Sequence, residues 1–119
     1  MTAYVIAVLR PTATVHPDVV TYIERVQSTF EPFGGRFLVH GPGRPGEWVE
    51  GERLGDIVMV EFPDLAAAHA WYASPAYQEI LPLRTEHMPG ELVFLEGVPA
   101  AYDATRTAAA IRSATAPGN

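Results

Sequence analysis

Two stretches of this chain are apolar on both alternating faces, and they constrain the fold more than any other feature. Residues 3–9 read Ala-Tyr-Val-Ile-Ala-Val-Leu, and residues 57–62 read Ile-Val-Met-Val-Glu-Phe. Successive side chains of a strand point to opposite faces, so both faces of these strands need cover. Two helices cover only one face of a four-stranded sheet. A second copy of the chain is the simplest cover for the other face, and the predicted assembly is a homodimer. The alternative cover is the C-terminal segment, which its small residues make less suitable.

The rest of the pattern places these strands in two similar β-α-β halves. Val19, Ile23, Val26 and Phe30 recur at helical spacing after Pro17 and predict one helix. The other elements are predicted as strands at 36–40 and 92–96, an extended hairpin arm at 47–50, a helix after Asp64 and a second helical piece from Ser74-Pro75 toward Arg84. This order is typical of a ferredoxin-like α+β fold, βαββαβ, with an antiparallel four-stranded sheet. Residues 1–98 are predicted as the domain. Residues 99–119 are predicted as a loosely ordered tail, with at most a helical turn at 108–112.

Composition excludes several kinds of partner. The formal net charge is -6, and such a surface repels nucleic acid and anionic lipid. The chain has no cysteine and therefore no thiolate nucleophile or Cys-based metal centre. No apolar run is long enough to span a bilayer, and the first residues are predicted as a strand. We therefore expect a cytoplasmic protein with no nucleic-acid or membrane partner.

Established catalytic motifs are missing from the sequence. There is no P-loop, dinucleotide fingerprint, nucleophile elbow or HExxH. The histidines at 16, 40, 69 and 87 include no pair at i, i+4 spacing with a carboxylate partner. We therefore expect no metal site and no cofactor.

Residues spread over 3–98 match the pattern of a known family. They are Tyr4, Tyr22, the run 33–39, Glu50-Gly51, the run 60–63, Ala70-Trp71-Tyr72, Ser74-Pro75, Tyr77, Arg84 and Leu95-Glu96-Gly97. With this combination the chain resembles the family called domain of unknown function 1330, in the dimeric α+β barrel superfamily. The resemblance implies the ferredoxin-like fold and the dimer. Similar sequences usually carry an arginine where His40 stands here, and an aromatic residue after Glu-Gly-Asp, where this chain reads Glu-Gly-Glu-Arg.

Three residues are candidates for catalysis. His40 ends a predicted strand beside a loop, where a histidine titrates near neutral pH and serves as a general acid or base; the alternative is a solvent-facing strand end. Glu50 lies across the same predicted hairpin and could orient His40 or act as the base, or it is a surface charge. Arg84 could bind a substrate carboxylate or enolate, or only complement the end of its helix.

Four aromatic residues are candidates for the walls of a binding site. Trp71, Tyr72 and Tyr77 follow one another along the second helical region, and Trp48 lies on the predicted hairpin. Aromatic side chains at such spacing usually form core. Their alternative role is to contact a ligand, with tyrosine hydroxyls donating hydrogen bonds.

Two functions from different classes agree with this pattern. The first is cofactor-independent acid–base chemistry of the isomerase, cyclase or monooxygenase type on a small acidic or aromatic metabolite, with a place in secondary metabolism. The resemblance supports it, because small monooxygenases, lactone isomerases and polyketide cyclases of the superfamily use a cavity between helices and sheet. Fold analogy alone does not establish an activity. The second function is a non-catalytic small-molecule-binding or accessory protein.

Overall fold

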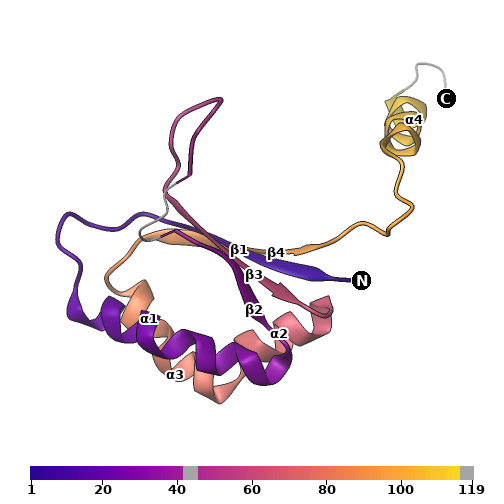
Figure 1. Ribbon diagram of the computed structural model, residues 1–119. Helices are drawn as coiled ribbons and strands as arrows, with labels where there is room; N and C mark the ends of the chain where they lie inside the picture. The colour runs from indigo at the N-terminus through magenta and orange to yellow at the C-terminus, as the bar shows by residue number, and fades with distance from the viewer. Residues whose placement is uncertain (42–45, 116–119) are drawn as a thin grey trace.

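The chain forms one antiparallel sheet with helices packed on one of its faces (Figure 1). The computed structural model describes residues 1–41 and 46–115. The strands stand in the order β2-β3-β1-β4, and every neighbouring pair is antiparallel. The elements in chain order are β1 (Ala3–Leu9), α1 (Pro17–Phe30), the short 3-10 helix η1 (Glu31–Phe33), β2 (Arg36–His40), β3 (Asp56–Phe62), α2 (Leu65–Ala73), α3 (Pro75–Thr85), β4 (Gly90–Glu96) and α4 (Ala104–Thr115). The predicted ferredoxin-like α+β fold is confirmed.

Helix boundaries follow from capping residues. The His16 side chain accepts a hydrogen bond from the Asp18 N–H at the start of α1, and Pro17 stands at the first helical position. The Asp64 carboxylate accepts from the Ala67 N–H to begin α2. Ser74 ends α2 and caps α3, accepting from the Tyr77 N–H. The second helical region is therefore two helices with a bend at one serine.

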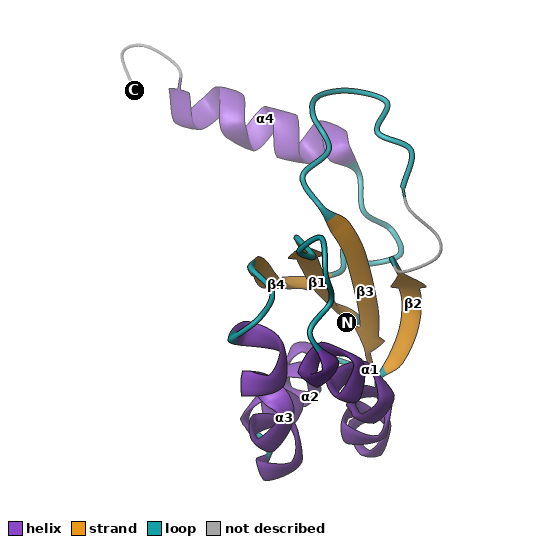
Figure 2. Cartoon of the chain, turned by 90° about the vertical axis from the view of Figure 1, so that its left-hand side faces the viewer, coloured by secondary structure: helices purple, strands orange, loops and turns teal. Residues whose placement is uncertain are grey.

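The core lies between the sheet and helices α1, α2 and α3. Figures 1 and 2 show all three helices on the same side of the sheet. Phe30 of α1, Phe62 of β3 and Tyr77 of α3 are fully buried. A Cβ on Gly35 would lie 2.9 Å from Phe62 Cε1 and 3.0 Å from Phe30 Cδ1. Only glycine fits at that position without moving the aromatic core, which explains the second glycine of the Gly34-Gly35 pair.

The opposite face of the sheet is largely apolar, and none of the helices in the described parts of the chain packs against it (Figures 1 and 2). Ile6 of β1 pairs with Met59 of β3 on one side and Val93 of β4 on the other, so these three side chains lie side by side. Nearby exposed residues extend the apolar surface to both sheet edges: Leu38, Val39, Val93 and Leu95 are 38–47% exposed. Within this face Glu61 forms an ion pair with Arg36 at 3.3 Å. We call this surface the open face.

Two segments differ from the sequence prediction. The structure has no strand at 46–50, so the extended arm predicted at 47–50 is wrong, and β3 begins only at Asp56. Of the loop predicted at 41–46, positions 42–45 lie outside the described residues. The C-terminal segment holds a helix, α4, that is longer than the turn predicted at 108–112 and exposed at every position. Both segments project from the side of the open face (Figures 1 and 2).

No helix among the described residues is both long and apolar enough to cross a membrane.

Candidate functional site

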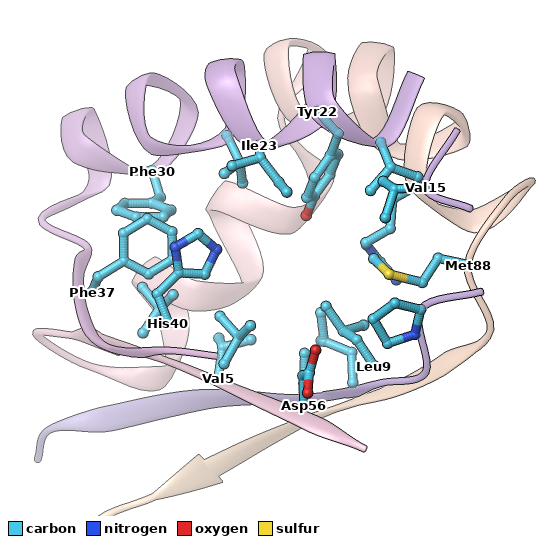
Figure 3. A pocket seen from close by; sticks show the side chains of 18 of the residues that line it. Val5, Leu9, Val15, Tyr22, Ile23, Phe30, Phe37, His40, Asp56 and Met88 are labelled. Carbon is cyan, nitrogen blue, oxygen red and sulfur yellow. The ribbon is translucent and has the colours of Figure 1, made fainter. Parts of the chain in front are cut away.

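A cavity of about 310 Å³ lies between α1 and the helix-covered face of the sheet (Figure 3). Aliphatic and aromatic side chains from β1, β3 and α1 form most of its wall. The titratable side chains in the wall are Tyr22, His40, Asp56 and Arg84. An apolar cavity with a few polar groups is the usual form of a small-molecule site.

His40 reaches this cavity because strand β2 contains a bulge. The β2–β3 pairing shifts between Phe37 and Val39, so Leu38 has no partner of its own. Without the bulge, Phe37 and His40 would face opposite sides of the sheet, since they are three positions apart. With it, both face the helices, and their rings stack with centroids 4.7 Å apart. The bulge therefore turns His40 from the open face into the cavity.

Gly41, the residue after His40, allows the end of β2 to approach β3 closely. A Cβ on Gly41 would lie 2.9 Å from the Ile57 carbonyl oxygen and 3.0 Å from Asp56 Cβ. Glycine allows the end of β2 to lie directly against the beginning of β3.

Burial controls the protonation state of His40. Its ring is partly removed from water, and desolvation lowers the pKa of His40 below its ordinary value of 6.5. The imidazole is therefore neutral at pH 7, with one nitrogen free to accept a proton or a hydrogen bond.

Arg84 brings a buried positive charge to the cavity wall. It lies in the last turn of α3 and is only 5% exposed. Its Nη2 donates a long hydrogen bond, 3.4 Å, to the Tyr77 hydroxyl, and its guanidinium lies 5.4 Å from the centre of the Tyr22 ring. Within residues 1–41 and 46–115, no carboxylate forms an ion pair with it. The charge is thus surrounded by aromatic rings and hydroxyls.

The two tyrosines beside Arg84 are joined to each other. The Tyr22 and Tyr77 hydroxyls are 2.8 Å apart, and their rings meet edge to face. Burial raises the pKa of Tyr22, so the phenol stays protonated at any physiological pH. Tyr22 points into the cavity in Figure 3, while Tyr77 stands behind it with no exposed surface. Arg84 and the Tyr22 hydroxyl together offer hydrogen-bond donors to an anionic oxygen.

Asp56 is a wall residue that the sequence analysis did not identify. It is the first residue of β3, and its carboxylate forms an ion pair with Arg53. Its side chain is only 16% exposed. Nothing in its sequence surroundings distinguishes it from a loop aspartate, because its place in the cavity depends on the pairing of β3 with β1 and β2.

The structure brings together some of the predicted site residues. His40, Arg84 and Trp71 line the same cavity, and Tyr77 contacts Arg84 from behind. The Trp71 ring is buried, and its Nε1 donates to Thr29 Oγ1 at 3.0 Å.

The other predicted site residues lie outside the cavity. Tyr72 is half-buried and lines a separate shallow groove that also contacts Arg84. Glu50 is exposed and Trp48 half-buried in the loop before β3, and neither lines the cavity. Their roles stay predictions.

A second group of ligating side chains lies beside the cavity. His16, Asp18 and His87 bring their donor atoms within 4.8 Å of one another. Their chain neighbours Val15 and Met88 line the cavity.

Solved structures share this fold at low sequence identity. RPA0582, a protein of unknown function from Rhodopseudomonas palustris, is 20% identical with a TM-score of 0.61, over 82% of this chain and 83% of that one. A dimeric ferredoxin-like protein of unknown function from Thermobifida fusca is 15% identical with a TM-score of 0.54, over 82% of this chain and 92% of that one. SnoaB, a cofactor-independent oxygenase from Streptomyces nogalater, is 8% identical with a TM-score of 0.51, over 86% and 96%.

No protein of curated function matches the chain. The family model of a domain of unknown function matches residues 2–98, which include every element that forms the cavity. The chain therefore belongs to the family named for that domain, DUF1330.

Proposed function

We propose that the cavity binds a small acidic molecule with an apolar or aromatic body, and that His40 moves a proton of that molecule without a cofactor. The single observation that carries the proposal is the buried guanidinium of Arg84, which lines an apolar cavity and has no carboxylate partner among the described residues. The reaction belongs to the isomerase, cyclase or monooxygenase type.

The charge of Arg84 defines the class of ligand. Removing a cation from water costs several kcal/mol unless an anion and good hydrogen bonds offset it. Here the compensation comes from uncharged groups: hydrogen bonding to the Tyr77 and Tyr22 hydroxyls and a cation–π contact with the Tyr22 ring. A carboxylate or enolate in the cavity would complete the pairing, since a guanidinium presents two parallel donors to such a group. The apolar wall requires that the rest of the ligand be apolar.

The neutral His40 supplies the proton acceptor. Because burial lowers its pKa below 6.5, the imidazole is mainly neutral at pH 7 and able to accept an acidic C–H proton. The negative charge that develops on the substrate oxygen is stabilised by Arg84 and the Tyr22 hydroxyl. SnoaB, described as a cofactor-independent oxygenase, has the same fold, which supports this reaction class and the expected place in secondary metabolism.

The same proposal includes a homodimer formed through the open face. Val93 and Leu95 are exposed on that face, beside Ile6 and Met59. A continuous apolar surface of this kind is unfavourable in water, at roughly 25 cal/mol per Å². A second copy placed by a two-fold axis would cover it with an identical apolar surface. The Thermobifida fusca neighbour is described as dimeric, which supports this arrangement.

One observation favours a second function, a non-catalytic small-molecule-binding or accessory protein. The His40 ring is held by stacking on Phe37, and within the described parts of the chain no carboxylate orients it. A catalytic histidine usually has such a partner to fix its tautomer. A binding protein would use Arg84 and the apolar wall in the same way and would need no base.

Hydrogen–deuterium exchange separates the two functions. Phenylpyruvate is a suitable probe because it joins a carboxylate to an aromatic body and has an enolisable carbon. In D2O, followed by proton NMR, we expect the protein to accelerate loss of the benzylic proton signal. His40→Asn should return the rate to that of buffer, while His69→Asn, at an exposed histidine of α2, should not. Binding of phenylpyruvate with no acceleration would support the binding protein and contradict catalysis.

A further inference from the structure

A cluster of metal-ligating side chains lies at the start of α1. His16 is the N-cap of α1, Asp18 lies in its first turn, and His87 comes from the turn between α3 and β4. The His87 Nε2 lies 3.1 Å from Asp18 Oδ2, and the His16 Nδ1 lies 3.8 Å from the same oxygen. The two imidazole rings are stacked, with centroids 3.6 Å apart. The ligand atoms of two imidazoles and a carboxylate thus lie within 4.8 Å of one another, although the histidines are 71 positions apart in the chain.

These distances agree with the size of a coordination sphere. Around a tetrahedral ion with bonds of ~2.1 Å, the ligand atoms lie roughly 3.4 Å apart. The two measured distances, 3.1 and 3.8 Å, lie on either side of that value. The stacked rings, with planes 5° apart, hold their in-plane lone pairs parallel, so one ring must turn out of the stack for the three lone pairs to converge on one ion. The side chains have the freedom to rotate, since those of His16 and Asp18 are 46% and 44% exposed.

We propose that His16, Asp18 and His87 bind one divalent transition-metal ion of the Zn²⁺ type. Imidazole with carboxylate is a donor set that Zn²⁺ and its neighbours accept, whereas Mg²⁺ and Ca²⁺ prefer oxygen alone. Three protein ligands leave a coordination position open for water or an anion, as in catalytic zinc sites. Val15 and Met88 line the cavity, so the ion would lie at the cavity rim. This proposal is independent of the proposed function.

Two local effects oppose the ion, and the cluster compensates for the first. The positive end of the α1 dipole disfavours a cation, but the Asp18 carboxylate supplies a full negative charge at the same place. The His16 Nδ1 already accepts a hydrogen bond of 3.0 Å from the Asp18 N–H. That bond uses the single lone pair of Nδ1, so coordination through this nitrogen would replace the capping hydrogen bond at the start of α1.

The test is zinc binding by the untagged full chain. In buffer freed of metal at pH 7.5, isothermal titration with ZnCl2 should show one site per chain. His16→Asn should lower the affinity at least about tenfold, and so should His87→Asn and Asp18→Asn. Asparagine is a good helix cap, so His16→Asn removes the ligand while keeping the start of α1. His69→Asn is the matched control and should bind zinc as the wild type does.

A second readout does not depend on the stability of the variants. Proton NMR of the wild-type imidazoles during zinc titration should shift the signals of His16 and His87 and leave those of His69 unchanged. The proposal is overturned if the wild type binds no zinc at micromolar concentration. It is also overturned if the three ligand variants bind zinc as tightly as His69→Asn, or if zinc shifts His69 as strongly as His16.

Discussion

Replacing Arg84 with methionine should make the protein more stable and remove its affinity for anions. Methionine has a similar length and no charge, so it fills the space of the side chain within the same aromatic surroundings. A residue retained only for packing would behave in the opposite way, because its loss would destabilise the fold. The substitution therefore tests whether Arg84 is present for a ligand.

The magnitude follows from the contacts of Arg84. The change removes one hydrogen bond of 3.4 Å to Tyr77 and a cation–π contact at 5.4 Å, together worth about 1–2 kcal/mol. It also removes the cost of keeping a guanidinium in a place that is only 5% exposed, which is several kcal/mol. We expect a net gain of about 1–3 kcal/mol in the free energy of unfolding. For a domain of this size the melting temperature should rise by roughly 4 °C per kcal/mol.

Binding of an anion should change in the other direction. Loss of a charge-assisted hydrogen bond of about 1.5–3 kcal/mol weakens affinity roughly 10- to 100-fold. Trp71 lines the cavity, so its fluorescence reports binding once Trp48→Phe removes the other tryptophan. The probes are 1-naphthoate and neutral 1-naphthalenemethanol, which share one aromatic body. In the Trp48→Phe background, Arg84→Met should weaken only the carboxylate.

Two results would refute this reasoning. A fall in unfolding free energy of more than about 1 kcal/mol in Arg84→Met would show that Arg84 is structural and already compensated. Equal weakening of both naphthalene probes would show that the substitution changed the shape of the cavity and not its charge preference.

The remaining predictions concern His40, the tyrosine pair and the open face. Burial lowers the pKa of His40 below its unfolded value of 6.5, so the folded state binds a proton less readily than the unfolded state. The free energy of unfolding should therefore fall as the pH drops below about 6.5. Urea unfolding at pH 7.5 and 5.5 should show a smaller fall in His40→Asn than in the wild type. Tyr77→Phe leaves the buried Tyr22 hydroxyl without its partner at 2.8 Å and should cost about 1–2 kcal/mol in the same unfolding assay. Met59→Glu places a charge in the centre of the open face and should give monomers by analytical ultracentrifugation. The control Val20→Glu changes a residue of α1 that is 47% exposed in the wild type and should leave a dimer. A monomeric wild type would contradict the homodimer.

Strong local signals made most of the fold predictable. The continuous apolar pattern of residues 3–9 and 57–62 requires strands, and each helix start has a capping side chain or proline at its own position. The predicted arm at 47–50 failed because a short polar segment forms a strand only if it finds a partner strand. None is paired with 46–50 in the described part of the chain. Strand pairing depends on the tertiary structure, and a segment of a few residues does not determine by itself whether a partner strand lies beside it.

The site was less predictable, because two of its features depend on register. Regular alternation from Phe37 would place Val39 toward the helices and His40 toward the open face. The bulge at Leu38 reverses this, and no residue in 36–40 is a glycine or proline that would indicate a bulge. Likewise, only the fold brings His87 to Asp18. Arg84 was predictable as a candidate from its place at a helix end, but the absence of a carboxylate partner among residues 1–41 and 46–115 was not.

The topology explains why Asp56 and Arg84 lie at one end of the cavity, which we call the polar end. Strand β3 begins at Asp56 and α3 ends just after Arg84, so both lie where β1 ends and β4 begins. His40 lies nearer the other end, stacked on Phe37 (Figure 3). The other end is closed by the contacts of Phe30, Phe62 and Trp71. Glu50 belongs to the segment before β3, which begins at Asp56. Because loops and element ends tolerate substitution better than the aromatic core does, substitutions at the polar end should change which ligand binds. Those at the aromatic end should mainly change stability.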